Sequence, residues 1–313
     1  MTGWGDNVAD YLRLRRQLGA SLIWHEHLLG QFANHLVASG IEAITVIEAI
    51  AWCSLLPAGV TTAPVTRAST RMTAVRGFAA YMHAVSPVHE VPPPGIFACP
   101  VHRPTPYIYT ATEITAVIQA ASPLAGGTRA HTYPVLFALL ATTGLRVGEA
   151  LALDRDTADL DTGVLLIRRG KGRDPRLVPL HPTATAALGR YAHWRDEQHH
   201  HDRGWAFFTD PGGQRLKYMT VRDNFVHAST AAGLRTQAQQ PRMHDLRHTF
   251  AVDTLLGWYR EGVDVAAKMP ALSIYLGHTD PANTYWYLSA VPELLAHAAA
   301  RLDTASTRRQ VAS

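Results

Sequence analysis

Cysteine and charge are both scarce in this chain of 313 residues. The two cysteines, Cys53 and Cys99, form no Cys-x-x-Cys pair and are too few for a disulfide framework. Charged residues make up only 17% of the chain and apolar residues 47%, so the chain is not intrinsically disordered. The N-terminus lacks the apolar core of a signal peptide, and no uncharged apolar run approaches the roughly 18–20 residues that span a membrane. These absences predict a soluble, reduced, intracellular protein.

Basic residues exceed acidic ones by a small margin. Lys and Arg number 29 against 25 Asp and Glu, which gives a formal net charge of +4, and 17 histidines add latent positive charge. This balance favours polyanionic partners only weakly. The placement of individual basic residues therefore matters more than their total.

Length and composition divide the chain into two domains. Residues 6–85 repeat apolar positions at helical spacing, which predicts a small all-helical unit. The segment 86–107 holds seven prolines, which exclude a helix or a central strand and predict an interdomain linker. The predicted boundaries are a helical domain over 1–86, a linker over 87–109, a second domain over 110–303 and a flexible tail over 304–313.

The second domain is predicted to be mainly helical with a small β-hairpin, and therefore an α+β fold. Residues 164–167 and 176–180 are rich in valine, leucine and isoleucine and are strand-like. The Gly-Lys-Gly-Arg-Asp segment between them, 170–174, is a basic hairpin tip. Lys171 on such a tip could donate a proton to a scissile group, although a solvated basic turn is the simpler interpretation.

Arg146 opens a short predicted helix in GLRVGEALAL, 144–153, directly after a glycine that suits a helix C-cap. The first turn of a helix presents free N–H groups and positive potential, so a guanidinium placed there suits a phosphate. Glu149 lies three residues on and shares this face. The alternative is a surface Arg–Glu pair that stabilises by less than about 1 kcal/mol.

His244, Arg247 and His248 share one face of a predicted helix in RMHDLRHTFAVDTLL, 242–256. A zinc site is one interpretation, because the two histidines have metal-ligand spacing. A hydrolytic zinc helix uses Glu as its general base where this chain has Asp245, and Arg247 would place a cation beside the metal. A phosphate site, in which an imidazole and a guanidinium address neighbouring oxygens, is a better interpretation than zinc. For any single histidine, a purely structural helix is the simpler interpretation.

His278 lies in a turn of LGHTDPANTYWYL, 276–288, between a glycine that ends one helix and a proline that begins the next. Two tyrosines, Tyr285 and Tyr287, follow on the new helix around Trp286. At about 100° per residue they point roughly 200° apart, so they cannot both face one phosphate. Helical geometry alone does not choose between them.

Taken in order, these motifs resemble the tyrosine recombinases, also called phage integrases. The resemblance covers about residues 110–300 and rests on GLRVGEAL, the GKGRDPRLVPL hairpin, HDLRHTFA, and LGH followed nine residues later by Tyr. It implies a catalytic domain over 110–303, preceded by a helical core-binding domain that contacts DNA. The TYWYLSAVPELL ending is similar to that of recombinases carried by transposons and other mobile elements.

The resemblance implies a site-specific recombinase or integrase that cuts and rejoins DNA through a 3′-phosphotyrosine intermediate, with no metal and no other cofactor. Arg146 and Arg247 would bind the non-bridging phosphate oxygens, because two fixed cations stabilise the extra negative charge of the transition state. Lys171 would protonate the leaving 5′-oxygen. Glu149 would hold these basic groups in place.

The same resemblance assigns the remaining site residues. His244 would contact the phosphate and help to take the proton of the tyrosine, and His278 would donate a further hydrogen bond to the phosphate. The nine-residue step from His278 selects Tyr287 as the nucleophile. Tyr285 and Trp286 are then expected to be packing residues.

Six arginines are further candidates for DNA contact, each with a solvated surface position as the alternative. They lie on the last helix of the first domain and beside the hairpin tip: Arg67, Arg71, Arg76, Arg168, Arg169 and Arg173. The expected partners are double-stranded recombination sites, further copies of the chain in a homotetramer on DNA, and companion recombinases. No membrane partner is expected, and the expected location is the bacterial cytoplasm at the nucleoid.

Two other functions stay open. The chain could be a catalytically weak accessory subunit that binds DNA ends within a multi-recombinase transposition system. It could also be a type IB topoisomerase, which uses the same phosphotyrosine chemistry. The small size and the helical first domain favour the recombinase. An apolar stripe over 292–302 predicts a final helix that docks on its own domain or on a neighbouring subunit.

Overall fold

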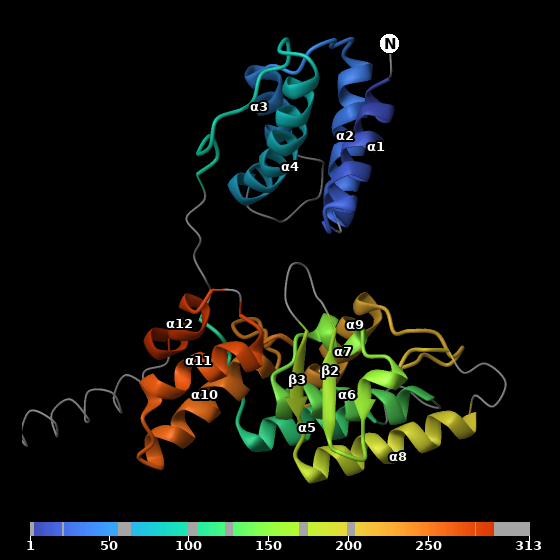
Figure 1. The fold of residues 1–313 in the computed structure, drawn as a ribbon, viewed down its shortest axis with the longest axis vertical. Helices are drawn as coiled ribbons and strands as arrows, with labels where there is room; N and C mark the ends of the chain where they lie inside the picture. Colours follow the sequence, from blue (N-terminus) through green and yellow to red (C-terminus); the bar gives the residue numbers. More distant parts are fainter. Residues whose placement is uncertain are drawn as a thin grey trace, which may run out of the picture. The chain divides into compact units, whose positions relative to one another are not determined.

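The fold is taken from a computed structural model that describes residues 3–20, 22–55, 64–98, 105–122, 128–168, 175–198, 204–278 and 280–290. The chain divides into two compact units, residues 1–103 and 104–313, coloured blue to teal and green to red in Figure 1. Each unit has its own hydrophobic core. Within the described residues, no helix is long and apolar enough to cross a membrane.

The first unit is a group of helices whose apolar stripes face one another. Its described helices are α1 (Trp4–Gln17), α2 (Ile23–Ala38), α3 (Val46–Ser54) and α4 (Pro64–Val85). Leu29 and Phe32 of α2 and Phe78 of α4 are completely buried in the shared core. Thr45 begins α3, because its hydroxyl accepts a hydrogen bond of 3.1 Å from the amide of Glu48.

The chain is bound to the first unit within the proline-rich segment and to the second unit directly after it. Arg76 of α4 donates hydrogen bonds of 2.9 and 3.0 Å to the carbonyls of Pro92 and Pro93. At the other end, Tyr109 is 3% exposed in the core of the second unit, and its amide donates to the hydroxyl of Thr249 at 3.0 Å. These contacts orient the chain as it leaves the first unit and enters the second.

The second unit is mainly helical with a small sheet, so the predicted α+β fold is confirmed. Helix α6 packs against α5, α8 and α10, and α5 also packs against α9. The elements in chain order are α5 (Ala111–Ala121), α6 (Thr128–Thr143), α7 (Val147–Leu151), the 3₁₀ turn η1 (Arg155–Thr157), β1 (Ala158–Asp159), β2 (Val164–Ile167), β3 (Arg176–Pro179), α8 (Pro182–Gln198), α9 (Tyr218–Ala231), α10 (Asp245–Arg260), α11 (Val265–Leu276) and α12 (Ala282–Ala290).

The sheet is antiparallel in the order β1-β2-β3. Leu165 of β2 lies opposite Val178 of β3, and both are completely buried, while the neighbouring Leu177 is 65% exposed. One face of the sheet therefore covers the core, as the alternation of side chains requires. The predicted strands are confirmed at 164–167 and 176–179, and the hairpin tip between them lies outside the described residues.

Glycines end two helices that lead into the site. Helix α6 ends before Gly144, which has φ +60°, so the predicted C-cap is confirmed. Helix α11 ends in the same way at Gly277, with φ +65°. The side chain of Phe250 lies so close to Gly144 that an added Cβ would come within 2.5 Å of its Cδ1. The predicted final helix over 292–302 lies outside the described residues.

Candidate active site

Arg146 occupies the position directly before α7, where the preceding glycine turn leaves its backbone extended. Its amide donates to Oε2 of Glu149 at 3.0 Å, and its Nη1 donates to Oε1 of the same carboxylate at 3.0 Å. The capping position of the helix therefore fixes the arginine and the glutamate together. The predicted Arg–Glu pair is part of a larger buried network.

The carboxyl end of α11 collects guanidinium groups from two other helices. Arg146 donates to the carbonyls of Leu276 and Gly277 at 3.1 and 2.8 Å. Arg247 of α10 is 2% exposed and donates to the carbonyls of Leu276 and Gly144, each at 2.7 Å. The last carbonyls of a helix carry partial negative charge, so they hold both cations side by side.

Arg176 of β3 is a third cation at this place. Its Nη1 and Nη2 bind the two oxygens of Glu149 at 3.1 and 2.8 Å, and its Nε donates to the carbonyl of Tyr275 at 2.8 Å. Both side chains of this ion pair are only 10% exposed. Gly277 gives the space for it, since an added Cβ would come within 2.7 Å of Nη1 of Arg176.

The charge balance of this network is positive. Burial alone would raise the pKa of Glu149, but the hydrogen bonds from Arg176 and Arg146, together with their charges, lower it to about 2. Burial and the neighbouring Arg146 lower the pKa of Arg247 to about 10, so this guanidinium keeps its charge at neutral pH. Three cations surround one carboxylate, and the remaining positive charge suits an anionic group.

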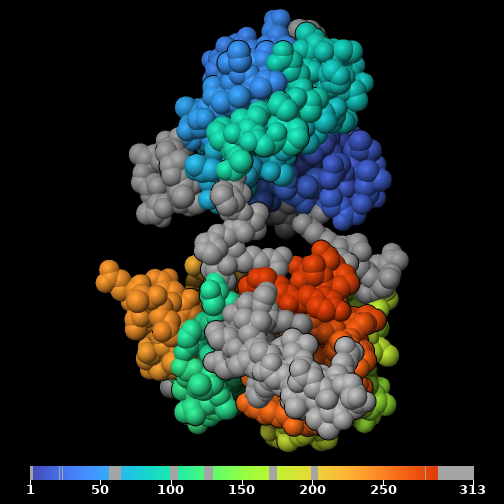
Figure 2. All heavy atoms as spheres, turned by 90° about the vertical axis from the view of Figure 1, so that its left-hand side faces the viewer, coloured from blue at the N-terminus to red at the C-terminus, as the bar shows by residue number. Residues whose placement is uncertain are grey.

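Tyr287 of α12 points into the unit and Tyr285 points outward. Tyr287 is 2% exposed, and its hydroxyl lies 3.0 Å from Nδ1 of His248. Tyr285 is 49% exposed, so the prediction that it is a packing residue is wrong. Trp286 packs at 5.5 Å from the ring of Tyr287 and 5.6 Å from that of His248, as expected of a supporting residue. In Figure 2, part of the red segment that includes α12 lies at the surface of the second unit.

His278 follows α11 and lies beside the same tyrosine. Its ring stacks on that of Tyr287 at 6.4 Å between centroids. Its Nδ1 is 2.6 Å from the hydroxyl of Thr284, a residue with no exposed surface. When this hydroxyl donates to Nδ1, the proton of the imidazole is on Nε2, which makes Nε2 a hydrogen-bond donor.

His244 immediately precedes α10, and its ring meets that of His248 edge to face at 4.8 Å. Part of the residue faces solvent, but desolvation of the imidazole and the charges of Arg247 and Arg146 lower the pKa of His244. A neutral imidazole beside these cations adds hydrogen-bonding capacity without adding charge. The described residues contain no group of three His, Cys, Asp or Glu side chains that could hold a metal ion.

The remaining predicted residues fall into two groups. Lys171, Arg169 and Arg173 lie outside the described residues. Arg168 is exposed, and its guanidinium pairs with Asp154 at 3.0 Å and Asp156 at 2.5 Å. These carboxylates neutralise the charge of Arg168 in this structure.

The three arginines of α4 differ in their surroundings. Arg71 is 4% exposed, donates to the carbonyls of Trp52 and Leu55, and lies 4.7 Å from the Trp52 ring. This burial holds α4 on α3, and the contact of Arg71 with DNA stays a prediction. Arg76 is bound to the proline-rich segment, as described above, and Arg67 is half-buried.

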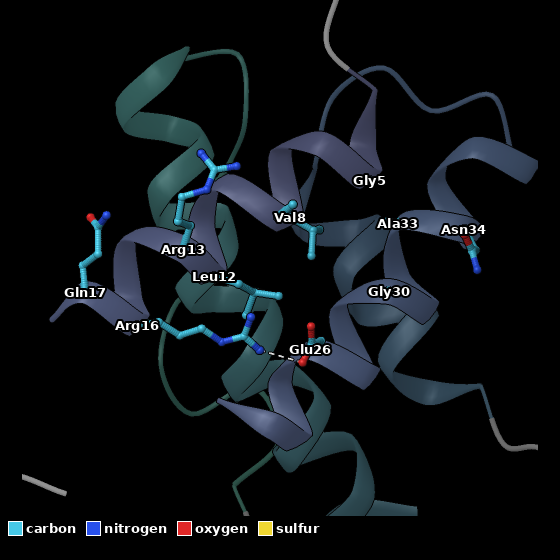
Figure 3. Close-up of a pocket in the computed structure, with 11 residues that line it drawn as sticks. Gly5, Val8, Leu12, Arg13, Arg16, Gln17, Glu26, Gly30, Ala33 and Asn34 are labelled. Carbon is cyan, nitrogen blue, oxygen red and sulfur yellow. Dashed lines mark hydrogen bonds and ion pairs between the residues drawn. The ribbon is translucent and has the colours of Figure 1, made fainter. Parts of the chain in front are cut away.

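A groove of about 740 Å³ between α1 and α2 contains none of these residues. Figure 3 shows that Val8 and Leu12 of α1 face Gly30 and Ala33 of α2 across it, with Arg16 paired to Glu26 at 2.6 Å near one end. Its centre is apolar, and its charged groups lie at the rim. It therefore lacks the converging polar groups that mark a catalytic site.

The arginine network, the buried tyrosine and the helical fold around a small sheet define a tyrosine recombinase, and comparison with known proteins confirms this class. Residues 108–293 match the phage integrase family, and the chain belongs to that family. A Sinorhizobium fredii protein, provisionally named integrase/recombinase y4rB, is 36% identical over 97% of this chain and 98% of its own length.

One further relative agrees with this assignment, and a solved structure shares the fold. Tyrosine recombinase XerD of Caulobacter vibrioides is 31% identical over 74% of this chain and 72% of its own length. A solved structure of the Tn1549 transposon integrase, in complex with transposon right end DNA, shares the fold with a TM-score of 0.64. It is 13% identical and covers 97% of this chain and 99% of that chain.

Sequence reasoning did not assign a site role to Arg176, His248 or Thr284. Arg176 was visible as one of several basic residues beside the hairpin, but its pairing with Glu149 is a contact between distant segments. His248 was visible on the face of His244, but its contact with α12 depends on how two helices cross. Thr284 carried no signal apart from its position between His278 and Tyr287.

Proposed function

We propose that this protein cleaves and rejoins DNA at specific sites, with Tyr287 as the nucleophile and Arg146 and Arg247 as the phosphate-binding cations. The observation that carries the proposal is the meeting of both guanidiniums on the carbonyl of Leu276, at 3.1 and 2.7 Å. The ionised phenol of Tyr287 would raise the pKa of Arg247, so the two groups are close enough to interact electrostatically.

The proposed reaction uses these residues together with Lys171. The Oη of Tyr287 attacks the scissile phosphorus and forms a 3′-phosphotyrosine, and the bond from phosphorus to the 5′-oxygen breaks. The phenol gives its proton to the neutral imidazole of His244, and Lys171 gives a proton to the leaving 5′-oxygen. Arg146 and Arg247 stabilise the added charge on the non-bridging oxygens. Attack by a 5′-hydroxyl of another duplex reverses these steps, so the reaction consumes no cofactor.

The histidines complete the proposed site. Nε2 of His278 donates to the phosphate, because Thr284 engages the other ring nitrogen. His244, which immediately precedes α10 and lies three residues before Arg247, also contacts the phosphate. Glu149 orients Arg146 and Arg176 through the hydrogen bonds described above.

We infer a tetramer on two DNA duplexes from the chemistry. Exchange between two duplexes requires four strands to be cut, and each chain supplies one Tyr287. Double-stranded DNA is then the partner, with Arg67 as a further contact in the first unit. Companion recombinases and residence at the nucleoid in the bacterial cytoplasm belong to the same proposal. Activity of the purified chain alone, with no companion added, tests the need for companions.

The test is covalent capture of DNA. The protein is incubated with a pool of short duplexes that carry a randomised centre and a nick, so that cleavage beside the nick releases a fragment and traps the adduct. Adducts that survive denaturation are isolated and sequenced, and the selected duplex is then used for all variants. Tyr287→Phe is expected to abolish the adduct, while the matched variant Tyr285→Phe retains it. An adduct formed by Tyr287→Phe would refute the assignment.

The cations have a test of their own. Arg247→Gln is expected to slow adduct formation by about 10²–10³-fold, the usual effect of removing one donor from a developing anion. Arg168→Gln removes an arginine that is already paired with carboxylates and is the matched control. Equal rates for the two variants would contradict the proposed phosphate site.

A further inference from the structure

The side chain of His248 lies within hydrogen-bond distance of the hydroxyl of the proposed nucleophile. Its Nδ1 lies 3.0 Å from Oη of Tyr287, and the two rings are 5.5 Å apart at 63°. The contact joins the first turn of α10 to α12, two helices that pack against each other. It therefore acts on the reacting atom and not only on the ring.

The imidazole of His248 is itself fixed by its neighbours. The ring of His244 meets it edge to face at 4.8 Å, and the ring of Trp286 lies at 5.6 Å and 57°. Aromatic contacts on two sides restrict rotation of the imidazole, so the direction of its Nδ1 lone pair is set before DNA binds. A rigid acceptor can orient a phenol that has only one proton to donate.

The surroundings of His248 favour the neutral ring, which can accept at Nδ1. Desolvation, followed by the adjacent His244, lowers the pKa of His248 to about 4, and Asp245 opposes this effect. The groups that face His248 from α10, from its N-terminal flank and from α12 are His244, Asp245, Arg242, Arg247 and Tyr287. A neutral ring that carries its proton on Nε2 accepts the hydrogen bond of the phenol at Nδ1.

We propose that His248 is a positioning residue for strand cleavage: its Nδ1 accepts the hydrogen bond of Tyr287 and so directs the lone pairs of Oη toward the phosphate. This inference rests on the proposed function, because it assigns His248 to the same reaction. The hydroxyl proton points to His248, and the lone pairs that form the new bond point elsewhere. His248 acts through Tyr287 and need not contact the DNA.

Two substitutions separate hydrogen bonding from packing. His248→Leu fills the space but offers no acceptor. His248→Asn places an amide oxygen close to the position of Nδ1 and can accept the same hydrogen bond, but it cannot take a proton. Adduct formation is followed in a single turnover on the duplex selected above, alongside equilibrium binding of the same duplex and thermal unfolding.

Leu is expected to slow adduct formation by about ten-fold or more, since misplacement of a reacting atom has a large effect on rate. Affinity for the duplex is expected to stay within about two-fold, because the lost hydrogen bond is internal to the protein. Asn is expected to recover most of the lost rate. Cleavage by the Leu variant at the wild-type rate, or an Asn variant as slow as Leu, overturns the proposal.

The contact can also be tested without DNA, so that its failure is distinct from failure of the proposed function. Nitrogen-15 NMR of the histidine-labelled full chain reports whether Nδ1 of His248 is an unprotonated hydrogen-bond acceptor. Tyr287→Phe is expected to shift this resonance, with the Tyr285→Phe variant as the control. A resonance that Tyr287→Phe leaves unchanged overturns the inference, whereas a wild-type protein that captures no DNA refutes the proposed function.

Discussion

Replacing Glu149 by Gln tests the ion network at the end of α11 most directly. The substitution keeps the shape of the side chain and removes the charge that separates Arg146 from Arg176. The pKa of Glu149 falls from an ordinary 4.5 to about 2 in the folded protein. At about 1.36 kcal/mol per pKa unit, the charged form contributes about 3 kcal/mol to folding at neutral pH. The side chain is only 10% exposed, so solvent screening reduces this value little.

The sign of the effect sets its pH dependence. The folded pKa is depressed, so the stabilisation is fully present above about pH 4.5 and declines as the pH falls toward 2. Denaturant unfolding of wild type and Glu149→Gln is measured at pH 7 and at lower pH. The difference in free energy of unfolding is expected to be about 3 kcal/mol at pH 7 and roughly half of that near pH 3.

Glu197 supplies the control for this experiment. It pairs with His193 on α8 at 3.1 Å, and its side chain is 54% exposed, so Glu197→Gln is expected to change stability by less than about 0.5 kcal/mol. If Glu149→Gln is no more destabilising than Glu197→Gln, or if its effect does not shrink with falling pH, the network does not hold the fold as described.

Three further predictions concern single residues. Gly277→Ala is expected to lower the free energy of unfolding by about 2 kcal/mol in denaturant titrations, because φ is +65° and the new methyl group meets Arg176. Thr284→Val is expected to slow adduct formation by about ten-fold while Thr284→Ser retains it, because only the hydroxyl engages His278. An equal loss in both would point to packing. Arg71→Met is expected to lower stability by about 1–3 kcal/mol in thermal unfolding, because two carbonyls lose their donor. Arg67→Met, at a half-buried position, is expected to weaken DNA binding with less effect on stability, and the reverse pattern would contradict both assignments.

The elements that carry the site were predictable because their signals are local. Short runs rich in valine, leucine and isoleucine predicted β2 and β3, and the glycine after α6 predicted the end of that helix. The helix predicted within 242–256 corresponds to α10, which begins at Asp245. Each motif was weak alone, but the order of the motifs along the chain indicated one family. The comparisons confirmed that family.

The contacts within the site were less predictable because they depend on tertiary packing. The burial of Arg71 against α3 was not predictable, because nothing in the spacing of α4 distinguishes Arg71 from Arg67. The exposure of Tyr285 follows from how α12 lies on α10 and α11, which periodicity does not give. The partner of Tyr287 is likewise a histidine from a distant helix.

Helix α11 contributes no arginine to the site, yet the carbonyls at its end hold the guanidiniums of Arg146, Arg176 and Arg247. These carbonyls and the carboxylate of Glu149 offset the repulsion among the three like charges. The proposed phosphate site therefore depends on the packing of α11 as much as on the arginines themselves. A substitution that shifts the end of α11 is expected to disturb all three guanidiniums together, although it changes none of them.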